Sequence, residues 1–466
     1  MEGAAMNPGK VLILGAARQG QALARFFSAQ GVHVVLNDIQ QPEALAQARQ
    51  ALSNLPIEWV LGSHPLDLLQ GVDLLCLSGG VPSDLPLVRA AQARGIPVSN
   101  DSEIFMERVL CPVIGITGSS GKSTTAALVA HIAELAAQPG QKVWLGGNIG
   151  TPLVDRLEEI KAGDLVVLEL SSFQLEWMSR SPHIAAVLNI TPNHLDRHPS
   201  FEAYKQAKAR ILAFQSLADT AILNREDPEA WSLKASVKGG LLTFGLQPLT
   251  GSQPGTYVRA GSVRFTGPQG ENDLLPLSSV HLLGAHNLAN VSAAACIGMA
   301  AGLPADSIAR GVDSFSGLPH RLETVYQAAG VTWVDDSIAT SPERVMAALK
   351  SLDQPLVILL GGRDKHLDWS ALAREITSRR PRVIVFGEAA PQITEALQRA
   401  QDRTSPIEIH SSSDLRDAVS TAGAIARRGD VVLLSPGATS FDEFRDFEER
   451  GSMFAHWAKA AAGERA

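Results

Sequence analysis

Short apolar runs alternate with amphipathic segments along most of the chain. Between residues 10 and 100, largely apolar runs at 11–14, 33–37 and 73–78 are followed by stretches with helical spacing. Runs of this length are typical of buried strands, and their alternation with helices predicts β-α-β units with a parallel sheet. The rhythm continues in further runs at 112–117, 143–145, 165–170, 185–190, 221–223, 331–334, 356–360, 383–386, 407–410 and 431–434. We therefore expect an α/β fold.

Breaks in this rhythm divide the chain into three domains. A connecting helix is expected at 101–109, and the Gly-Leu-Pro sequence at 317–319 marks a second boundary. The expected domains are a Rossmann-like N-terminal domain (1–108), a central P-loop ATPase-like domain with a mostly parallel sheet (109–317) and a C-terminal Rossmann-like α/β domain (318–466). The Gly-rich stretch 240–276 predicts antiparallel hairpins at a sheet edge, and an amphipathic helix is expected at 442–461.

Residues 112–125 read PVIGITGSSGKSTT, which predicts a strand, a tight polar loop and the start of a helix. Such a loop binds phosphate through backbone N–H groups and the helix dipole, while a lysine adds charge and a hydroxyl reaches Mg²⁺. The spacing is a variant, because Ile116 stands where the common pattern has its first Gly. An ordinary turn that carries a lysine is the alternative. The expected phosphate-binding residues are Gly118, Ser119, Ser120, Gly121, Lys122, Ser123 and Thr124.

Composition narrows the class of protein. The net charge of −8 argues against a nucleic-acid-binding surface, where an excess of basic residues is expected. Cys76, Cys111 and Cys296 lie in apolar contexts, which predicts buried free thiols and a reducing compartment. The N-terminus lacks the apolar core of a signal peptide, and no apolar run reaches the ~18 residues of a spanning helix. We expect a cytoplasmic enzyme without a membrane span.

The first domain has its own candidate site. Its first turn reads GAARQG, so Ala17 replaces the middle Gly of the dinucleotide pattern and keeps a pyrophosphate at a greater distance. Asp38 closes the second strand, where ribose-binding carboxylates often lie, and Ser78 closes a later one. This combination favours a nucleotide-sugar site, with a purely structural unit or a dinucleotide site as alternatives.

Acidic and histidine residues follow two strands of the central domain. Glu169 lies at the end of the run 165–170, where it could hold Mg²⁺ or act as a cap or ion-pair partner. His194, Asp196 and His198 cluster just after the run 185–190. This loop is suited to metal or phosphate binding, although ordinary turn contacts would also explain it.

Several polar residues remain ambiguous on sequence alone. Lys205 and Lys208 share one face of a helix and are typical of solvated surface lysines. Asn287 and Asn290, near a helix start, could cap that helix or contact an adenine edge. Arg321, at the threshold of the third domain, could reach a phosphate.

Three turns of the third domain follow strand ends. They read DDS at 335–337, GGRDK at 361–365 and SPGATS at 435–440. Because the carboxyl ends of parallel strands meet at one edge, we expect these turns to converge. Arginine, lysine and hydroxyl groups together are suited to binding a carboxylate.

The chain as a whole resembles the Mur ligase family. The motifs that carry this resemblance are GITGSSGKST, GGNIGTPL, LELSSFQLE, LNITPNHLDRH, YKQAKAR, GAHNLANVSAA, GLPHRLE, DDSIAT and LSPGATSFDEFRDFEERG. LELSSFQLE and the closing motif resemble the branch that adds D-glutamate. The resemblance implies ATP-dependent addition of D-glutamate to UDP-N-acetylmuramoyl-L-alanine (UDP-MurNAc-L-Ala) through an acyl phosphate, in cytoplasmic peptidoglycan precursor synthesis. It also implies two Mg²⁺ ions and, we expect, a monomer.

The resemblance assigns roles to individual positions. It implies catalytic roles for Lys122, His194 and Lys208, and Mg²⁺ ligation by Ser123, Glu169, His194 and Lys208, the last as a CO₂-derived carbamate. It places the adenosine end of ATP on Asn287, Asn290, Arg321 and Asp336, with His320 beside them. It places the UDP-sugar on Arg18, Gln19, Asp38, Ser78 and Asn148. It places D-glutamate on Thr340, Lys365, Ser440 and Phe447.

Two positions depart from the family pattern. Ile338 stands where many members have Lys, and Arg363 stands where many have Asp. Arg363 could supply the missing cation, or that contact could be absent. One alternative activity is another ligase of the superfamily, such as a folylpolyglutamate synthetase, which would not need a first domain carrying Asp38. A non-catalytic nucleotide-binding module is a second alternative, and it would tolerate the loss of Lys208.

Overall fold

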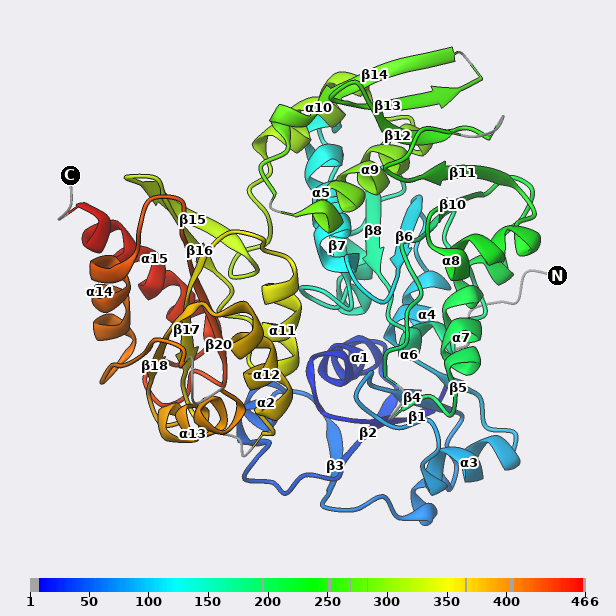
Figure 1. Ribbon diagram of the computed structural model, residues 1–466. Coiled ribbons are helices and arrows are strands. Elements are labelled where there is room, and N and C mark those ends of the chain that lie inside the picture. Colours follow the sequence, from blue (N-terminus) through cyan, green and yellow to red (C-terminus); the bar gives the residue numbers. More distant parts are fainter. Residues whose placement is uncertain are drawn as a thin grey trace. The chain divides into compact units, whose positions relative to one another are not determined.

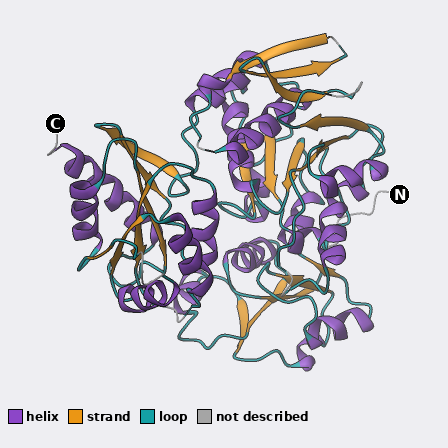
Figure 2. Ribbon diagram, in the orientation of Figure 1, coloured by secondary structure: helices purple, strands orange, loops and turns teal. Residues whose placement is uncertain are grey.

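The computed structural model describes residues 8–194, 197–249, 253–268, 270–282, 284–364, 367–401 and 406–463 (Figure 1). They form three sheets of mostly parallel strands, with helices packed against them (Figure 2), which confirms the expected α/β class. The chain divides into two compact units, residues 1–280 with 289–314, and residues 281–288 with 315–466. The first unit contains two of the sheets and the second unit contains the third.

The first sheet is five-stranded and parallel, in the order β3-β2-β1-β4-β5. Apolar side chains on both of its faces are buried, because α-helices cover a parallel sheet on each side. Its elements are β1 (Lys10–Leu14), α1 (Arg18–Ala29), β2 (His33–Asp38), α2 (Ala46–Ala51), β3 (Ile57–Leu61), β4 (Leu74–Leu77), α3 (Pro86–Ala93), β5 (Val98–Ser99) and the connecting α4 (Asp101–Met106).

The second sheet is nine-stranded, in the order β14-β13-β12-β11-β10-β9-β6-β8-β7. Its strands are β6 (Val113–Thr117), β7 (Val143–Gly147), β8 (Leu165–Glu169), β9 (Ile184–Val187), β10 (Thr220–Asn224), β11 (Gly240–Phe244), β12 (Gly255–Arg259), β13 (Ser262–Gly267) and β14 (Gly270–Pro276). The expected antiparallel edge is confirmed for β12 to β14. It is wrong for β11, which pairs in parallel with β10, since β11 extends the regular β-α-β series.

The described residues of this part of the chain form the α-helices α5 (Lys122–Ala136), α6 (Ser172–Leu175), α7 (Phe201–Ala213), α8 (Pro228–Ser232), α9 (Ala285–Ala300) and α10 (Ala305–Ser314). Strands β6 and β8 are parallel neighbours, so the loops that follow them open at the same edge of the sheet. These loops contain the Gly/Ser sequence and the residues after Glu169.

The third sheet is six-stranded, in the order β15-β16-β20-β17-β18-β19, and only its β15–β16 pair is antiparallel. Its elements are β15 (Glu323–Ala328), β16 (Val331–Asp335), α11 (Pro342–Lys350), β17 (Leu356–Gly361), α12 (Ser370–Arg379), β18 (Arg382–Phe386), α13 (Ala390–Ala400), β19 (Ile409–Ser411), α14 (Leu415–Ile425), β20 (Val431–Gly437) and α15 (Phe447–Gly463). The expected start of the last helix at residue 442 is wrong. The chain turns first, and the carbonyl of Ser440 accepts the N–H groups of Glu443 and Phe444.

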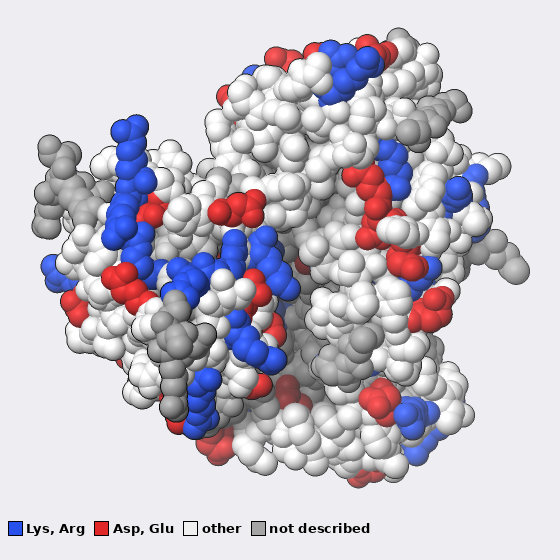
Figure 3. Space-filling view, in the orientation of Figure 1, with Lys and Arg blue, Asp and Glu red and all other residues white. Residues whose placement is uncertain are grey.

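The surface and the helices add two observations. Acidic and basic side chains are intermixed over the face of the molecule in Figure 3. Within the described ranges, every helix is too short or too polar to cross a bilayer.

Gly20 provides a test of the packing in the first domain. A Cβ at this position would lie 1.8 Å from the carbonyl oxygen of Gly15, so helix α1 could not approach the turn that follows β1. We expect Gly20→Ala to lower the free energy of unfolding by about 1–3 kcal/mol, as overpacking generally does. Urea unfolding followed by fluorescence would measure the change. Gly163→Ala is the matched control, because a Cβ there meets nothing within 4 Å. Equal stability of the two variants would contradict the packing argument.

Candidate active site

The Gly/Ser loop connects β6, which lies between β9 and β8 in the nine-stranded sheet, to α5. Gly121 caps the helix with a φ of +79°, a left-handed conformation that favours glycine. Two contacts to the neighbouring strand end hold the loop: the N–H of Ser119 donates to the carbonyl of Asn189 at 2.9 Å, and the N–H of Ser120 donates to its side-chain Oδ1 at 2.9 Å. Ser123 and Thr124 lie in the first turn of α5. A glycine loop between a strand end and a helix N-terminus is the arrangement that phosphate-binding loops share.

Two lysines converge on this loop from different elements. Nζ of Lys122, in α5, lies 2.9 Å from the carbonyl oxygen of Gly118, and Nζ of Lys208, in α7, lies 2.8 Å from the same oxygen. Lys208 is 1% exposed, so the expectation of a solvated surface lysine is wrong, while Lys205 forms an ion pair with Glu229. Burial and the charge of Lys122 hold the pKa of Lys208 well below its usual value, against the opposing effect of Glu169.

Glu169 contributes a buried carboxylate beside these lysines. It ends β8 and is 2% exposed. Its Oε1 accepts a hydrogen bond from Nδ2 of Asn148 at 2.8 Å, and its carbonyl accepts the N–H of Asn148 at 2.8 Å. Oε2 is buried without a hydrogen-bond partner among the described residues. An unsatisfied buried carboxylate oxygen is costly in an apoprotein and is suited to receiving a cation.

Aromatic contacts link the histidine loop to the lysine helix. His194, with a φ of +54°, packs edge-on against Phe173 of α6 at 5.2 Å between ring centroids, and His198 stacks on the same ring at 5.2 Å. Tyr204 of α7 lies 2.9 Å from Oγ of Ser119, and its ring lies 4.7 Å from Nζ of Lys208. Asp196 lies outside the described residues.

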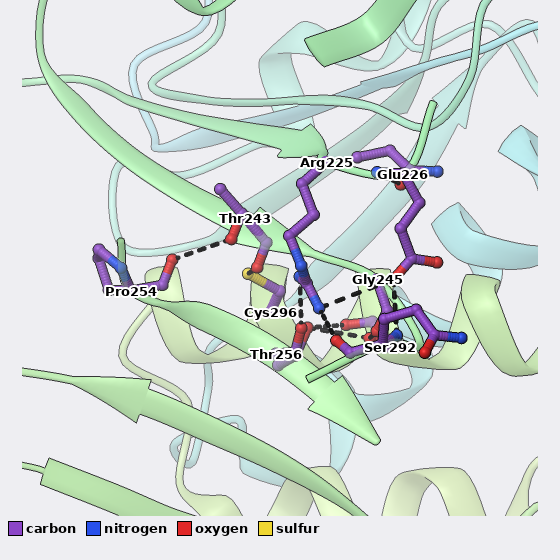
Figure 4. A network of polar contacts seen from close by, with 10 residues as sticks. Arg225, Glu226, Thr243, Gly245, Pro254, Thr256, Ser292 and Cys296 are labelled. Carbon is purple, nitrogen blue, oxygen red and sulfur yellow. Dashed lines mark hydrogen bonds and ion pairs between the residues drawn. The ribbon is translucent and has the colours of Figure 1, made fainter. Parts of the chain in front are cut away.

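Helix α9 carries the two asparagines, and Asn290 lies against the Gly/Ser loop. A Cβ on Gly121 would lie 2.3 Å from Oδ1 of Asn290, so the two groups are in close contact. A polar network fixes this helix to the sheet (Figure 4): Oγ of Ser292 donates to the carbonyl of Gly245 at 3.0 Å, and Oγ1 of Thr256 donates to the carbonyl of Ser292 at 2.8 Å. Asn287 lies near the start of the same helix and is 8% exposed.

The candidate UDP-sugar residues surround the first turn of the N-terminal domain. The carboxylate of Asp38 accepts the N–H groups of Ala16 and Gln40 at 2.8 and 2.9 Å, so it stabilises the turn itself. Arg18 donates to the carbonyl of Gly150 at 3.0 Å. Oε1 of Gln19 accepts the N–H of Gly79 at 2.7 Å, next to the buried Ser78.

In the second unit, polar side chains gather where β16 and β20 end. Oδ2 of Asp336 accepts a hydrogen bond from Ser435 at 2.7 Å, and burial raises the pKa of Asp336 to about 7. His320 has a φ of +61° and pairs with Asp335 at 2.7 Å, which raises the pKa of His320. The side chains of His320, Glu323 and Asp335 bring one ligand atom each within 4.8 Å of one another. Arg321 follows His320 on the same turn.

Arg450 stabilises the turns at this edge through hydrogen bonds, and it was not among the functional residues predicted from the sequence. It is fully buried in α15, where burial lowers its pKa to about 10. Its guanidinium donates to Oγ and the carbonyl of Ser337, both at 2.9 Å, and to the carbonyl of Ala438 at 3.1 Å. It therefore joins two of the three turns that were expected to converge. An arginine on the buried face of an amphipathic helix was the available signal.

The candidate D-glutamate residues lie around the same turns. Ser440 is buried, Thr340 is half-buried, and the ring of Phe447 packs edge-on against His320 at 6.2 Å. Lys365 lies outside the described residues. The guanidinium of Arg363 pairs with the carboxylate of Glu388 at 3.2 and 3.3 Å. The backbone N–H of Arg363 donates to the carbonyl of Thr439 at 2.8 Å.

The Arg363–Glu388 pair bears on whether Arg363 can replace the lysine that many family members have at the position of Ile338. Both side chains are about half exposed, at 48% and 53%. An exposed pair of this kind contributes about 1 kcal/mol or less, so a substrate carboxylate could compete for the guanidinium. Ile338 itself offers no cation.

Most of the chain matches the domains of one known protein family. Residues 9–100 match the Mur ligase MurD-like N-terminal domain, residues 116–298 match the Mur ligase middle domain, and residues 320–437 match the Mur ligase glutamate ligase domain. The UDP-N-acetylmuramoylalanine–D-glutamate ligase of Symbiobacterium thermophilum is 38% identical over 445 residues, which is 96% of each chain. The enzyme of the same name from Koribacter versatilis is 37% identical over 446 residues, again 96% of each chain.

Solved structures share the fold at lower identity. MurF from Acinetobacter baumannii superposes with a TM-score of 0.58 at 16% identity, covering 96% of this chain and 93% of that one. MurF ligase from Thermotoga maritima, solved in complex with ADP, superposes with a TM-score of 0.55 at 16% identity, covering 98% and 99%. These structures support the architecture of the three sheets.

Gly121 allows a test of the phosphate cradle. Gly121→Ala would add strain at a φ of +79° and a clash with Asn290, and we expect about tenfold weaker binding of an ATP analogue. Isothermal titration calorimetry would measure the dissociation constant. Gly140→Ala is the matched control, because Gly140 has a similar φ of +87° but open space around its Cβ position. If both variants bind the analogue as the wild type does, the cradle does not hold the nucleotide.

Proposed function

Because the chain belongs to the Mur ligase family, we propose that it joins D-glutamate to UDP-MurNAc-L-Ala with ATP. The terminal carboxylate of the UDP-sugar substrate attacks the γ-phosphorus of ATP, which gives an acyl phosphate and ADP. The amine of D-glutamate then attacks the acyl carbon and loses a proton, and inorganic phosphate leaves from the tetrahedral intermediate. This activity would serve the synthesis of peptidoglycan precursors.

One observation carries this proposal: the approach of Lys122 and Lys208 to the carbonyl of Gly118, beside the carboxylate of Glu169. Phosphoryl transfer is accelerated mainly by positioning and by neutralising charge on the transferred group. A glycine loop with an adjacent lysine supports the binding of the β- and γ-phosphates of ATP. The Asn148 amide, held by Glu169, is available next to the same strand end.

The residues present fit a divalent cation. Oε2 of Glu169 is a buried oxygen with no hydrogen-bond partner in the described part of the chain, and Ser123 and His194 are candidates to complete the ligand set. Bound Mg²⁺ would neutralise phosphate charge at this edge. The two-ion arrangement rests on the family resemblance.

Lys208 needs a chemical change before it can share a site with a cation. An ammonium would repel the metal, whereas its lowered pKa favours the neutral amine. The amine lone pair can attack the carbon of CO₂ and form an N–C bond, and loss of one N–H proton then leaves an anionic carbamate. We propose that this carbamate provides an oxygen ligand.

The other substrates are assigned to separate sets of residues. The adenosine end of ATP is proposed to meet Asn287, Asn290, Arg321 and Asp336. The UDP-sugar is proposed to meet Arg18, Gln19, Asp38, Ser78 and Asn148. D-Glutamate is proposed to meet Thr340, Lys365, Ser440 and Phe447. We propose a monomer in the cytoplasm, a compartment that suits the three buried free thiols.

A different amide ligase of the superfamily is the main rival. The parallel five-stranded domain at residues 9–100, which matches the MurD-like N-terminal domain, favours the UDP-sugar substrate over a folate.

Phosphate release would test the reaction directly. With ATP, Mg²⁺ and UDP-MurNAc-L-Ala present, we expect release to require D-glutamate and to stay near background with L-glutamate, L-alanine or meso-diaminopimelate. A colorimetric phosphate assay, with mass spectrometry of the product, would measure this. Release with another amino acid and none with D-glutamate would contradict the assignment.

Lys208→Ala tests the carbamate. We expect at least about a 100-fold loss of kcat, comparable to removing one electrostatic group at a transition state, with partial rescue by added acetate or formate. Lys205→Ala is the matched control on the same helix, since Lys205 pairs with Glu229 instead. A ¹³C NMR carbamate signal after equilibration with labelled bicarbonate should be present in the wild type and absent from Lys208→Ala. Full activity of Lys208→Ala would disprove the role.

A further inference from the structure

Asn189 lies just after β9, and none of the proposed steps of the reaction uses its side chain. Its Oδ1 accepts the backbone N–H of Ser120 at 2.9 Å, and its Nδ2 donates to the backbone carbonyl of Ser120 at 3.2 Å. Oδ1 also accepts the hydroxyl of Ser120 at 3.3 Å. The carboxamide therefore pairs with both backbone groups of one residue of the Gly/Ser loop.

The residue type at position 189 suits this pairing. A carboxamide carries an acceptor oxygen and a donor NH₂ group in one plane, whereas a carboxylate offers acceptors alone. An aspartate here would place a second oxygen against the carbonyl of Ser120, and it would add a negative charge beside a loop that is expected to bind phosphate. Asparagine therefore fits both the backbone of the loop and the charge of its expected ligand.

The backbone of the same residue holds Ser119. The carbonyl of Asn189 accepts the N–H of Ser119 at 2.9 Å, so the N–H groups of Ser119 and Ser120 are both bonded to Asn189. An α-helix leaves its first N–H groups without intrahelical partners, and α5 begins at Lys122. We therefore expect the donors to phosphate to come from the start of α5 rather than from the two serines.

Both peptide groups that flank Asn189 are fixed by the turn after β10. Nδ2 of Asn224 donates to the carbonyl of Leu188 at 2.9 Å, and Oδ1 of Asp227 accepts the N–H of Ile190 at 3.3 Å. Asn224 is the last residue of β10, and Asp227 is the N-cap of α8. The backbone of Asn189 is therefore held on the side of the loop and on the side of the turn.

Arg225 connects this turn to β11 and β12. Its backbone N–H donates to the carbonyl of Phe244, in β11, at 3.1 Å. Its guanidinium donates to the carbonyl of Thr256, in β12, at 2.9 Å (Figure 4). A series of hydrogen bonds thus runs from these strands through the turn and Asn189 to the Gly/Ser loop.

We propose that Asn189 is a positioning residue that holds Ser119 and Ser120 in place, so that the N–H groups at the start of α5 face the phosphates of the nucleotide. It sets the nucleotide affinity without touching the nucleotide, and Asn224 acts through it. This inference rests on the proposed function for the identity of the nucleotide. The hydrogen bonds between Asn189 and the loop do not depend on it.

Calorimetry of the full chain would test the role. We expect Asn189→Ala to raise the dissociation constant of a non-hydrolysable ATP analogue about tenfold, the change that corresponds to the net contribution of one or two hydrogen bonds. The dissociation constant of adenosine, which has no phosphate, should stay within about twofold of wild type. An equal loss of affinity for both ligands would show general destabilisation and overturn the proposal.

Asn37→Ala is the matched control. Asn37 is fully buried in the first domain, and its Nδ2 donates to the carbonyls of Val60 and Ser63, both at 2.7 Å. Its replacement also removes an asparagine that holds a loop, but at a different sheet. The dissociation constant of the ATP analogue should therefore remain that of wild type. An increase of the same size as in Asn189→Ala would contradict a specific effect on the Gly/Ser loop.

Asn224→Ala tests the support behind Asn189, and it provides the test should Asn189→Ala fail to fold. We expect about threefold weaker binding of the ATP analogue, with adenosine binding again unchanged. Because Asn224 acts through Asn189, the two effects should be markedly less than additive in the double variant. Fully additive effects would show that Asn224 does not act through Asn189. Unchanged affinity for the analogue in the folded single variants would disprove the positioning role.

Amide hydrogen exchange gives a readout that does not require nucleotide binding. The N–H of Ser120 should exchange faster in Asn189→Ala than in wild type or Asn37→Ala, because its acceptor is removed. If wild type releases no phosphate with D-glutamate, the proposed function fails while this measurement still tests how the loop is held. Unchanged exchange at Ser120 in Asn189→Ala would overturn the inference even in an active enzyme.

Discussion

Lys122 and Lys208 both donate to one carbonyl oxygen, that of Gly118, and this crowding of cations is the constraint on which the active site depends. Two ammonium groups near one peptide oxygen repel each other, and the buried one cannot be compensated by water. The site therefore favours either an anion between them or the neutral form of Lys208. A phosphate group would satisfy the first condition, and the neutral amine of the second is the form that the proposed carbamylation of Lys208 requires.

The surrounding fold keeps this arrangement rigid. Strands β6 and β8 are adjacent, so Glu169 and the Gly/Ser loop open at one edge. Tyr204 connects the loop to helix α7, and the Ser292–Thr256–Gly245 contacts fix α9, which carries Asn290, to the sheet. In the second unit, Arg450 joins two turns through backbone and hydroxyl contacts. Buried polar groups that are satisfied in this way specify one arrangement of loops that would otherwise be mobile.

The sequence was sufficient for the fold class because strand and helix periodicities are local. It also located the Gly/Ser loop and Glu169, since both follow strand ends. The burial of Lys208 could not be predicted from spacing, because i,i+3 lysines on a helix are usually solvated and only tertiary packing reveals otherwise. Arg450 and Tyr204 were missed for the same reason. The start of α15 was predicted too early, because the turn at Ser440 satisfies backbone groups that a longer helix would have used.

Asp101, at the start of α4, and Glu169 show that an unpartnered buried carboxylate oxygen can lie in different electrostatic surroundings. Both are nearly inaccessible and each has one such oxygen in the described structure. Glu169 lies beside the buried lysine and the Gly/Ser loop, so a cation there would complete a charged set. Burial raises the pKa of Asp101 to about 7, which shifts its carboxyl group toward the neutral form. A neutral carboxyl group gives a cation no ligand charge, so Glu169 is the better suited of the two to the proposed cation.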